Sequence, residues 1–120
     1  MYSEIFKDHL ASPRHAGEMA NADVRAEQTN PVCGDRLALF MRLSEGRILA
    51  ASVRAYGCAP TLACGSALVE MIHGMRLEDA ALIKREDLTR ALGGLPRRKQ
   101  HAAALAVETL RDALEAAQNL

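Results

Sequence analysis

The chain has 120 residues and a mass of 13.0 kDa, which is the size of one compact domain. Hydrophobic residues make up 49% of it and charged residues 25%, and this composition excludes a disordered or collagen-like chain. Fifteen basic and fifteen acidic residues cancel, so no overall positive charge attracts nucleic acid or an anionic membrane surface. We therefore expect a single globular domain over residues 1–120 that binds neither.

The cysteine content indicates a reducing compartment. The chain has three cysteines, which are Cys33, Cys58 and Cys64. An odd number does not fit a secreted disulfide framework. The first residues contain no apolar signal segment, and no stretch approaches the roughly 18 apolar residues of a membrane span. We expect a cytoplasmic protein with no membrane contact. Since a chain of this length can bury a sufficient core by itself, any bound metal would serve function first.

The first half of the chain predicts a short helix followed by strands. Apolar residues among polar ones after Ser3 predict a capped amphipathic helix that ends at Pro13. A loop follows, with one short strand near residues 24–28. Strict alternation of apolar and polar residues predicts strands over 36–44 and 47–55, which the intervening turn joins into a β-hairpin.

The second half predicts helices. One covers residues 60–73, two short ones cover 77–83 and 86–92, and a long amphipathic helix extends from Arg97 to the end of the chain. Strands come first and helices later, which is typical of the α+β class. We therefore expect an antiparallel sheet covered on one side by helices.

Two thiols, a carboxylate and an imidazole form a candidate metal site. Cys33 and Asp35 flank Gly34 just before the first hairpin strand, and Cys58 follows the second strand. Because the strands are antiparallel, we expect the loops that carry Cys33 and Cys58 to meet at one end of the hairpin. His101 completes the site if the start of the terminal helix docks there. Zinc, iron and iron-sulfur clusters recruit such ligands.

Simpler interpretations of these residues remain open. Cys64 shares a helix face with Leu68 and Ile72, which favours core packing, although an early helix position would lower its pKa and bring it toward the loop of Cys58. Asp35 equally fits a solvated turn residue.

The other three histidines and a possible Cys-His pair predict no further site. His9, His15 and His73 have no ligand-like neighbours in sequence and are expected at the surface. Cys58 and His101 would suffice for a Cys-His hydrolase, but no flanking signature supports one.

The chain resembles the U-type iron-sulfur cluster assembly scaffolds, the family of IscU and the amino-terminal domain of NifU. The resemblance covers nearly the whole chain and includes an opening helix similar to the family's. The motifs that carry it are Ser12-Pro13-Arg14-His15-Ala16-Gly17, Cys33-Gly34-Asp35, Tyr56-Gly57-Cys58, Ser66-Ala67-Leu68-Val69-Glu70-Met71 and Gly94-Leu95-Pro96 with Lys99 and His101.

The resemblance implies a three-stranded antiparallel sheet with flanking helices and a carrier rather than an enzyme. Such scaffolds bind iron or zinc, receive sulfur from a cysteine desulfurase, build a transient [2Fe-2S] cluster and pass it to acceptor apo-proteins. Carried over by position, Cys33 and Cys58 are thiolate ligands and His101 is the imidazole ligand. Asp35 is a ligand or the group that keeps the cluster labile, because a carboxylate holds iron more weakly than a thiolate.

The chain departs from the family pattern at two places. Ala102 stands where the family has a third cysteine, so this is a divergent member in which Cys64 is the candidate replacement and a fifth cofactor-binding residue. The alternative is a zinc-bearing regulatory or sulfur-relay partner of a desulfurase that assembles no clusters. The family's Leu-Pro-Pro-x-Lys stretch for an Hsp70-type chaperone, a further candidate partner, reads Leu95-Pro96-Arg97-Arg98-Lys99 here.

Overall fold

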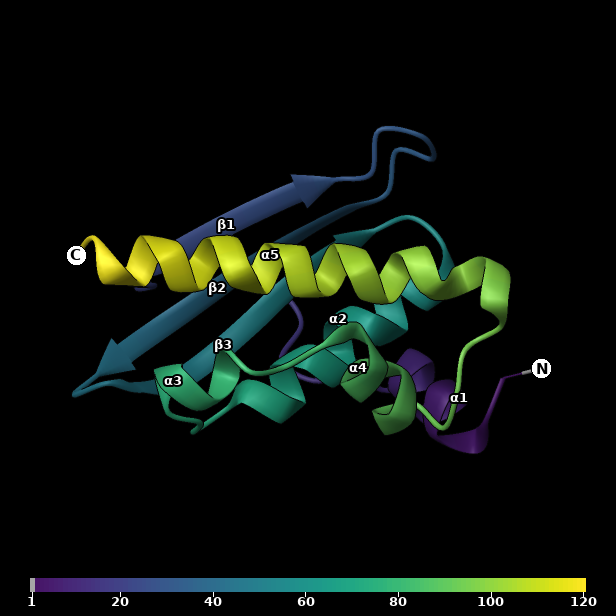
Figure 1. Ribbon diagram of the computed structural model, residues 1–120, viewed down its shortest axis with the longest axis horizontal. Helices are drawn as coiled ribbons and strands as arrows, with labels where there is room; N and C mark the ends of the chain where they lie inside the picture. The colour runs from purple at the N-terminus through teal and green to yellow at the C-terminus, as the bar shows by residue number, and fades with distance from the viewer. Residues whose placement is uncertain (1) are drawn as a thin grey trace.

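The computed structural model describes residues 2–120, and three antiparallel strands form a sheet within them in the order β1-β2-β3 (Figure 1). These strands are β1 (Val24–Thr29), β2 (Arg36–Ser44) and β3 (Arg47–Tyr56). β2 and β3 pair directly across the Glu45-Gly46 turn, and β1 pairs along the other edge of β2. The predicted hairpin and the short strand before it are therefore confirmed.

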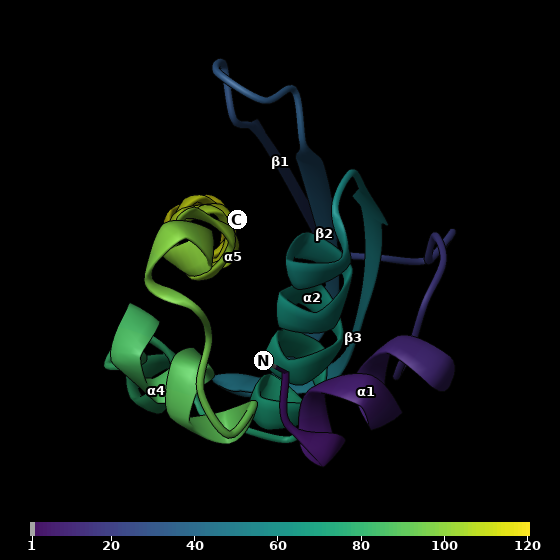
Figure 2. The ribbon, with the colours of Figure 1, turned by 90° about the vertical axis from the view of Figure 1, so that its right-hand side faces the viewer.

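Helices cover one face of this sheet (Figure 2). α2 and the long α5 lie side by side against it, and α1 and α4 pack on α2. This confirms the predicted α+β arrangement. The helices and their bounds are α1 (Glu4–Ala11), α2 (Ala59–Ile72), α3 (Leu77–Ala80), α4 (Arg85–Ala91), the 3-10 turn η1 (Arg97–Lys99) and α5 (Gln100–Gln118).

The core lies between the sheet and the helices. Leu37, Leu39 and Met41 alternate along β2 and point to the same face, and they are fully buried. α2 contributes Leu68 and Ile72 to this cluster, at the four-residue spacing that places both on one helix face. Each such side chain contributes about 1.5–3 kcal/mol of burial free energy, so the core fixes how α2 and α5 sit on the sheet.

The segment between α1 and β1 passes on the opposite side of β3 from α2 (Figure 2). It is attached to β3 by a short parallel bridge. Gly17 N–H donates to the Val53 carbonyl at 2.9 Å, and Val53 N–H donates to the His15 carbonyl at 3.0 Å. The bridge pairs the otherwise free edge of β3 at this point.

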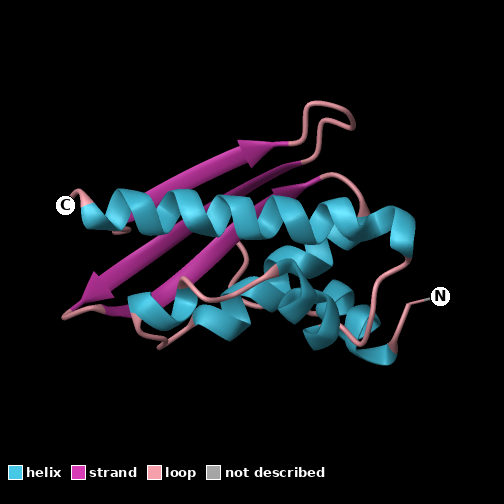
Figure 3. Cartoon of the chain, in the orientation of Figure 1, coloured by secondary structure: helices cyan, strands magenta, loops and turns pink. Residues whose placement is uncertain are grey.

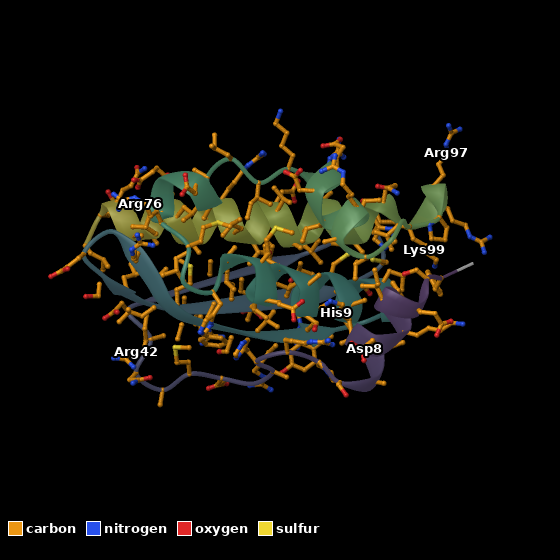
Figure 4. The ribbon with its side chains drawn as sticks, turned by 90° about the horizontal axis from the view of Figure 1, so that it is seen from below. Asp8, His9, Arg42, Arg76, Arg97 and Lys99 are labelled. Carbon is orange, nitrogen blue, oxygen red and sulfur yellow. The ribbon has the colours of Figure 1, made fainter. Side chains whose placement is uncertain are left out.

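His9 is buried, so its predicted surface position is wrong. Its side chain is 4% exposed and lies on the side of α1 that faces α2 (Figure 4). Nδ1 is 2.7 Å from Ser66 Oγ, and Nε2 is 3.5 Å from Glu70 Oε1. Burial and then the positive charge of Arg14 lower the pKa of His9, while Glu70 and Asp8 act in the other direction.

The other two histidines expected at the surface are exposed there. The rings of His15 and His73 stack on each other with their centroids 4.6 Å apart. Within residues 2–120, no helix combines the length and the apolar character needed to cross a membrane.

Candidate metal centre

The loop between β1 and β2 carries Cys33 and Asp35. Asn30 closes it: its N–H donates to the Asp35 carbonyl at 2.8 Å, and its carbonyl accepts from Gly34 N–H at 2.8 Å. The Asn30 side-chain oxygen accepts from Val32 N–H at 2.9 Å. This side-chain closure is typical of asparagine in turns, and it leaves the Cys33 side chain exposed near the end of the loop.

The connection between β3 and α2 lies at the same end of the sheet (Figure 3). Tyr56, the last residue of β3, pairs with Arg36, the first residue of β2. Asp35 and Gly57 therefore flank one cross-strand pair. Cys58 follows as the N-cap residue of α2, with Pro60 in the first turn, where a missing N–H costs nothing.

Asp35 is buried, with 7% of its surface exposed, so the solvated-turn interpretation is wrong. Its Oδ2 accepts from Thr61 Oγ1 at 2.8 Å, from Cys58 Sγ at 3.0 Å and from Cys58 N–H at 3.4 Å. Burial acts to raise the pKa of Asp35. The hydrogen bonds from Cys58, Thr61 and Cys33 outweigh it and hold the pKa below the usual aspartate value.

Gly57 makes room for this carboxylate. A Cβ at position 57 would lie 2.2 Å from Asp35 Oδ1 and 2.3 Å from its Cγ, well inside van der Waals contact. Gly57 also has a φ of 135°, which side-chain-bearing residues rarely adopt. The glycine of Tyr56-Gly57-Cys58 is therefore required on two independent grounds.

His101 brings the third part of the chain to the site. It lies in the first turn of α5 and lines a pocket together with Asn30, Pro31 and Val32 of the β1–β2 loop. Ligand atoms of Cys33, Asp35 and His101 all lie within 4.8 Å of one another. In residues 2–120 this is the one group of three or more such donors that converges so closely.

These donors fit a zinc or iron site. The converging group itself offers one thiol, one carboxylate and one imidazole, and Cys58, which is not part of that group, places a second thiol 3.0 Å from Asp35 Oδ2. Zinc and iron accept all of these ligand types. The four donors come from three separate chain segments. The expected meeting of the Cys33 and Cys58 loops at one end of the hairpin is what the structure shows, and the start of α5 joins them there.

Cys64 lies in α2, inside the core. It is 0% exposed and belongs to the hydrophobic cluster. Burial and then the neighbouring Cys58 raise its pKa to about 12, so it stays protonated at neutral pH. Its predicted core packing is confirmed, and its participation in cofactor binding stays a prediction.

The hydrogen bonds of Cys58 bear on the hydrolase alternative. Its thiol contacts Asp35 and Thr61, and no imidazole is among its hydrogen-bond partners in the described part of the chain.

Thr61 contacts both Asp35 and Cys58, and the sequence analysis did not identify it. The sequence feature that could have indicated it is a hydroxyl side chain three residues after the candidate ligand Cys58, at the start of a predicted helix.

The family described as NifU-like N terminal domain matches residues 1–119. The chain belongs to this family. Two relatives carry the name iron-sulfur cluster assembly scaffold protein. IscU 1 of Archaeoglobus fulgidus is 38% identical over 95% of this chain and 74% of its own length. IscU of Escherichia coli K12 is 33% identical over 94% of this chain and 91% of its own.

The fold of this NifU-like domain is also found among solved structures. A nitrogen-fixing NifU-like protein (N-terminal) from Brucella abortus superposes with a TM-score of 0.76. The match covers 94% of this chain and 91% of that one at 14% sequence identity, so it bears on the fold alone.

Proposed function

We propose that this NifU-like domain is an iron-sulfur cluster assembly scaffold. It binds iron or zinc, holds a transient [2Fe-2S] cluster and passes it to acceptor apo-proteins. The observation that carries this proposal is the convergence of Cys33, Asp35 and His101 within 4.8 Å, with the thiol of Cys58 3.0 Å from Asp35. The scaffold names of its relatives support it.

The donor set suits temporary binding. Thiolates of Cys33 and Cys58 hold iron strongly, whereas Asp35 and His101 supply weaker ligands than two further thiolates would. Cys33 lies exposed on its loop, where a partner protein can reach it, while Asp35 and Cys58 are more enclosed. Because Cys33 is more exposed than Asp35 and Cys58, iron and sulfur can reach the centre at the Cys33 thiolate, and the cluster can leave there without global unfolding.

The partners are those that membership of the family implies. Sulfur comes from a cysteine desulfurase, acceptor apo-proteins take the finished cluster, and an Hsp70-type chaperone is a further partner. The protein is a carrier with no turnover of its own, and it works in the cytoplasm, where thiols stay reduced.

Anaerobic reconstitution tests the proposal. The protein is incubated with ferrous iron, cysteine and a cysteine desulfurase, and the visible absorption of a cluster is recorded. We expect a cluster with the native protein and its loss with Cys33→Ala or Cys58→Ala. Cys64→Ala removes a thiol that lies outside the converging donors, and a lost cluster in this variant would identify Cys64 as the fifth ligand, whereas an unchanged one would exclude it. Absence of any cluster or bound metal in the native protein refutes the scaffold function.

A second candidate is favoured by one observation. Residue 102, directly after His101, is a fully buried alanine, so the chain has no thiol there to accept sulfur. A zinc-bearing regulatory partner of a desulfurase would need none, whereas a sulfur-relay partner would carry the sulfur on another of the three cysteines. Elemental analysis and mass spectrometry after desulfurase treatment separate the two. Bound zinc with no added sulfur on any cysteine supports the regulatory protein, whereas a cluster supports the scaffold.

A further inference from the structure

Thr61 occupies an unusual place for a threonine inside a helix. It is the third residue of α2, and its side chain is fully buried. Buried threonines in helices commonly bond to a carbonyl four residues earlier, as Thr109 does to the Leu105 carbonyl at 2.8 Å. Thr61 instead donates to the carboxylate of Asp35, 26 residues away in sequence.

The Thr61 hydroxyl contacts two candidate ligands at once. Oγ1 is 2.8 Å from Asp35 Oδ2 and 3.5 Å from Cys58 Sγ. Its backbone is fixed, since Thr61 N–H donates to the Cys58 carbonyl at 3.0 Å in the first turn of α2. The helix thus holds one hydroxyl in contact with both a carboxylate and a thiol.

This placement becomes important when a metal binds. In the structure, the Cys58 thiol donates its proton to Asp35 Oδ2 across 3.0 Å. When a metal takes the Cys58 sulfur as a ligand, that hydrogen bond to Asp35 cannot persist. Two hydrogen bonds from the start of α2 to Asp35 Oδ2 then remain, one from the Thr61 hydroxyl and one from the Cys58 N–H.

We propose that Thr61 is a positioning residue of the metal centre, whose hydroxyl holds Asp35 beside the Cys58 thiolate and thereby sets how tightly a metal is retained. This inference rests on the proposed function. Thr61 touches no metal itself and acts through Asp35. Groups that orient metal ligands in this way typically change metal affinity about 10- to 100-fold when they are removed.

Anaerobic titration with Co²⁺ tests the inference, because cobalt bound to thiolates absorbs strongly near the ultraviolet. Thr61→Val keeps the shape and removes the hydroxyl, and we expect it to weaken Co²⁺ binding about 10- to 100-fold. Thr61→Ser restores the hydroxyl and should return the affinity to within about threefold of the native value. Thr109→Val removes another buried helical hydroxyl, which bonds to the Leu105 carbonyl within α5, and should leave Co²⁺ binding unchanged.

A double-substitution cycle shows whether Thr61 acts through Asp35. In an Asp35→Ala background, Thr61→Val should have no further effect on Co²⁺ affinity. Thermal unfolding of each apo variant reports folding separately from metal binding. If Thr61→Val does not fold, Thr61→Ala gives the same comparison with a smaller side chain.

The outcomes separate this inference from the proposed function. If the native protein binds no Co²⁺ and assembles no cluster, the proposed metal centre is wrong, and the inference about Thr61 is wrong with it. If the native protein binds Co²⁺ and Thr61→Val binds it equally well, the metal centre stands and the inference about Thr61 is wrong. An undiminished effect of Thr61→Val in the Asp35→Ala background also overturns it.

Discussion

Replacing Gly57 by alanine tests whether the Asp35 carboxylate is held where the site requires it. The added methyl group would lie 2.2 Å from Asp35 Oδ1, so either the carboxylate or the backbone of residues 57–58 must move. Both movements separate Asp35 from its donors on Thr61 and Cys58. The change therefore acts on the centre although Gly57 contributes no ligand.

The expected cost has two parts. A side chain at a φ of 135° costs about 1–3 kcal/mol in backbone strain. Displacing the buried carboxylate loses hydrogen bonds to a charged group, each contributing about 1.5–3 kcal/mol. We expect Gly57→Ala to lower the free energy of unfolding by about 3–6 kcal/mol, a large share of the total for a domain of this size.

Gly17→Ala is the matched control. Gly17 has a similar φ of 116°, but a Cβ there meets nothing within 4 Å. It should cost about 1–3 kcal/mol from strain alone and leave Co²⁺ affinity unchanged. Urea unfolding and Co²⁺ titration of both variants give the comparison. The reasoning is refuted if Gly57→Ala loses no more stability than Gly17→Ala and binds Co²⁺ as tightly as the native protein.

Two further predictions concern buried groups. His9 has a lowered pKa in the folded state, so the unfolded chain takes up its proton first; stability should be complete above about pH 6.5 and fall as the pH drops below it. Thermal unfolding between pH 7.5 and 5.5 should show a smaller decrease for His9→Gln, and an equal decrease would contradict this origin. Cys64, with a pKa of about 12, should resist Ellman's reagent in the native state while the other two thiols react. Cys64→Ala should cost about 1 kcal/mol of stability and no Co²⁺ affinity, and fast labelling of Cys64 would contradict its burial.

The elements and the approach of the loops that carry the candidate ligands could be predicted from the sequence because both depend on local patterns. Alternation over residues 36–44 and 47–55 defines the hairpin, and antiparallel pairing then brings the loops of Cys33 and Cys58 together. Helix signals around Pro60 and the periodicity after Arg97 likewise depend on near neighbours.

The residues that were misjudged depend on distant contacts. His9 is buried in the interface between α1 and α2, where its ring is hydrogen-bonded to Ser66, 57 positions later. The partner of Thr61 is 26 positions earlier, on another loop. Neither pairing leaves a periodic pattern in the sequence. The first follows from how α1 packs on α2, and the second from how the start of α2 meets the loop between β1 and β2, which only the three-dimensional arrangement defines.

The origin of the donors in three segments affects how the centre can come apart. His101 lies in the first turn of α5, directly after η1, whereas Cys33, Asp35 and Cys58 belong to loops anchored by the hairpin. Terminal turns of helices open at a small fraction of the free energy of global unfolding. Opening of the first turn of α5 would withdraw the imidazole and also expose the fully buried Ala102 and Ala103, while the hairpin that anchors the other three donors stays paired. Amide hydrogen exchange at residues 100–103 would report this local opening directly.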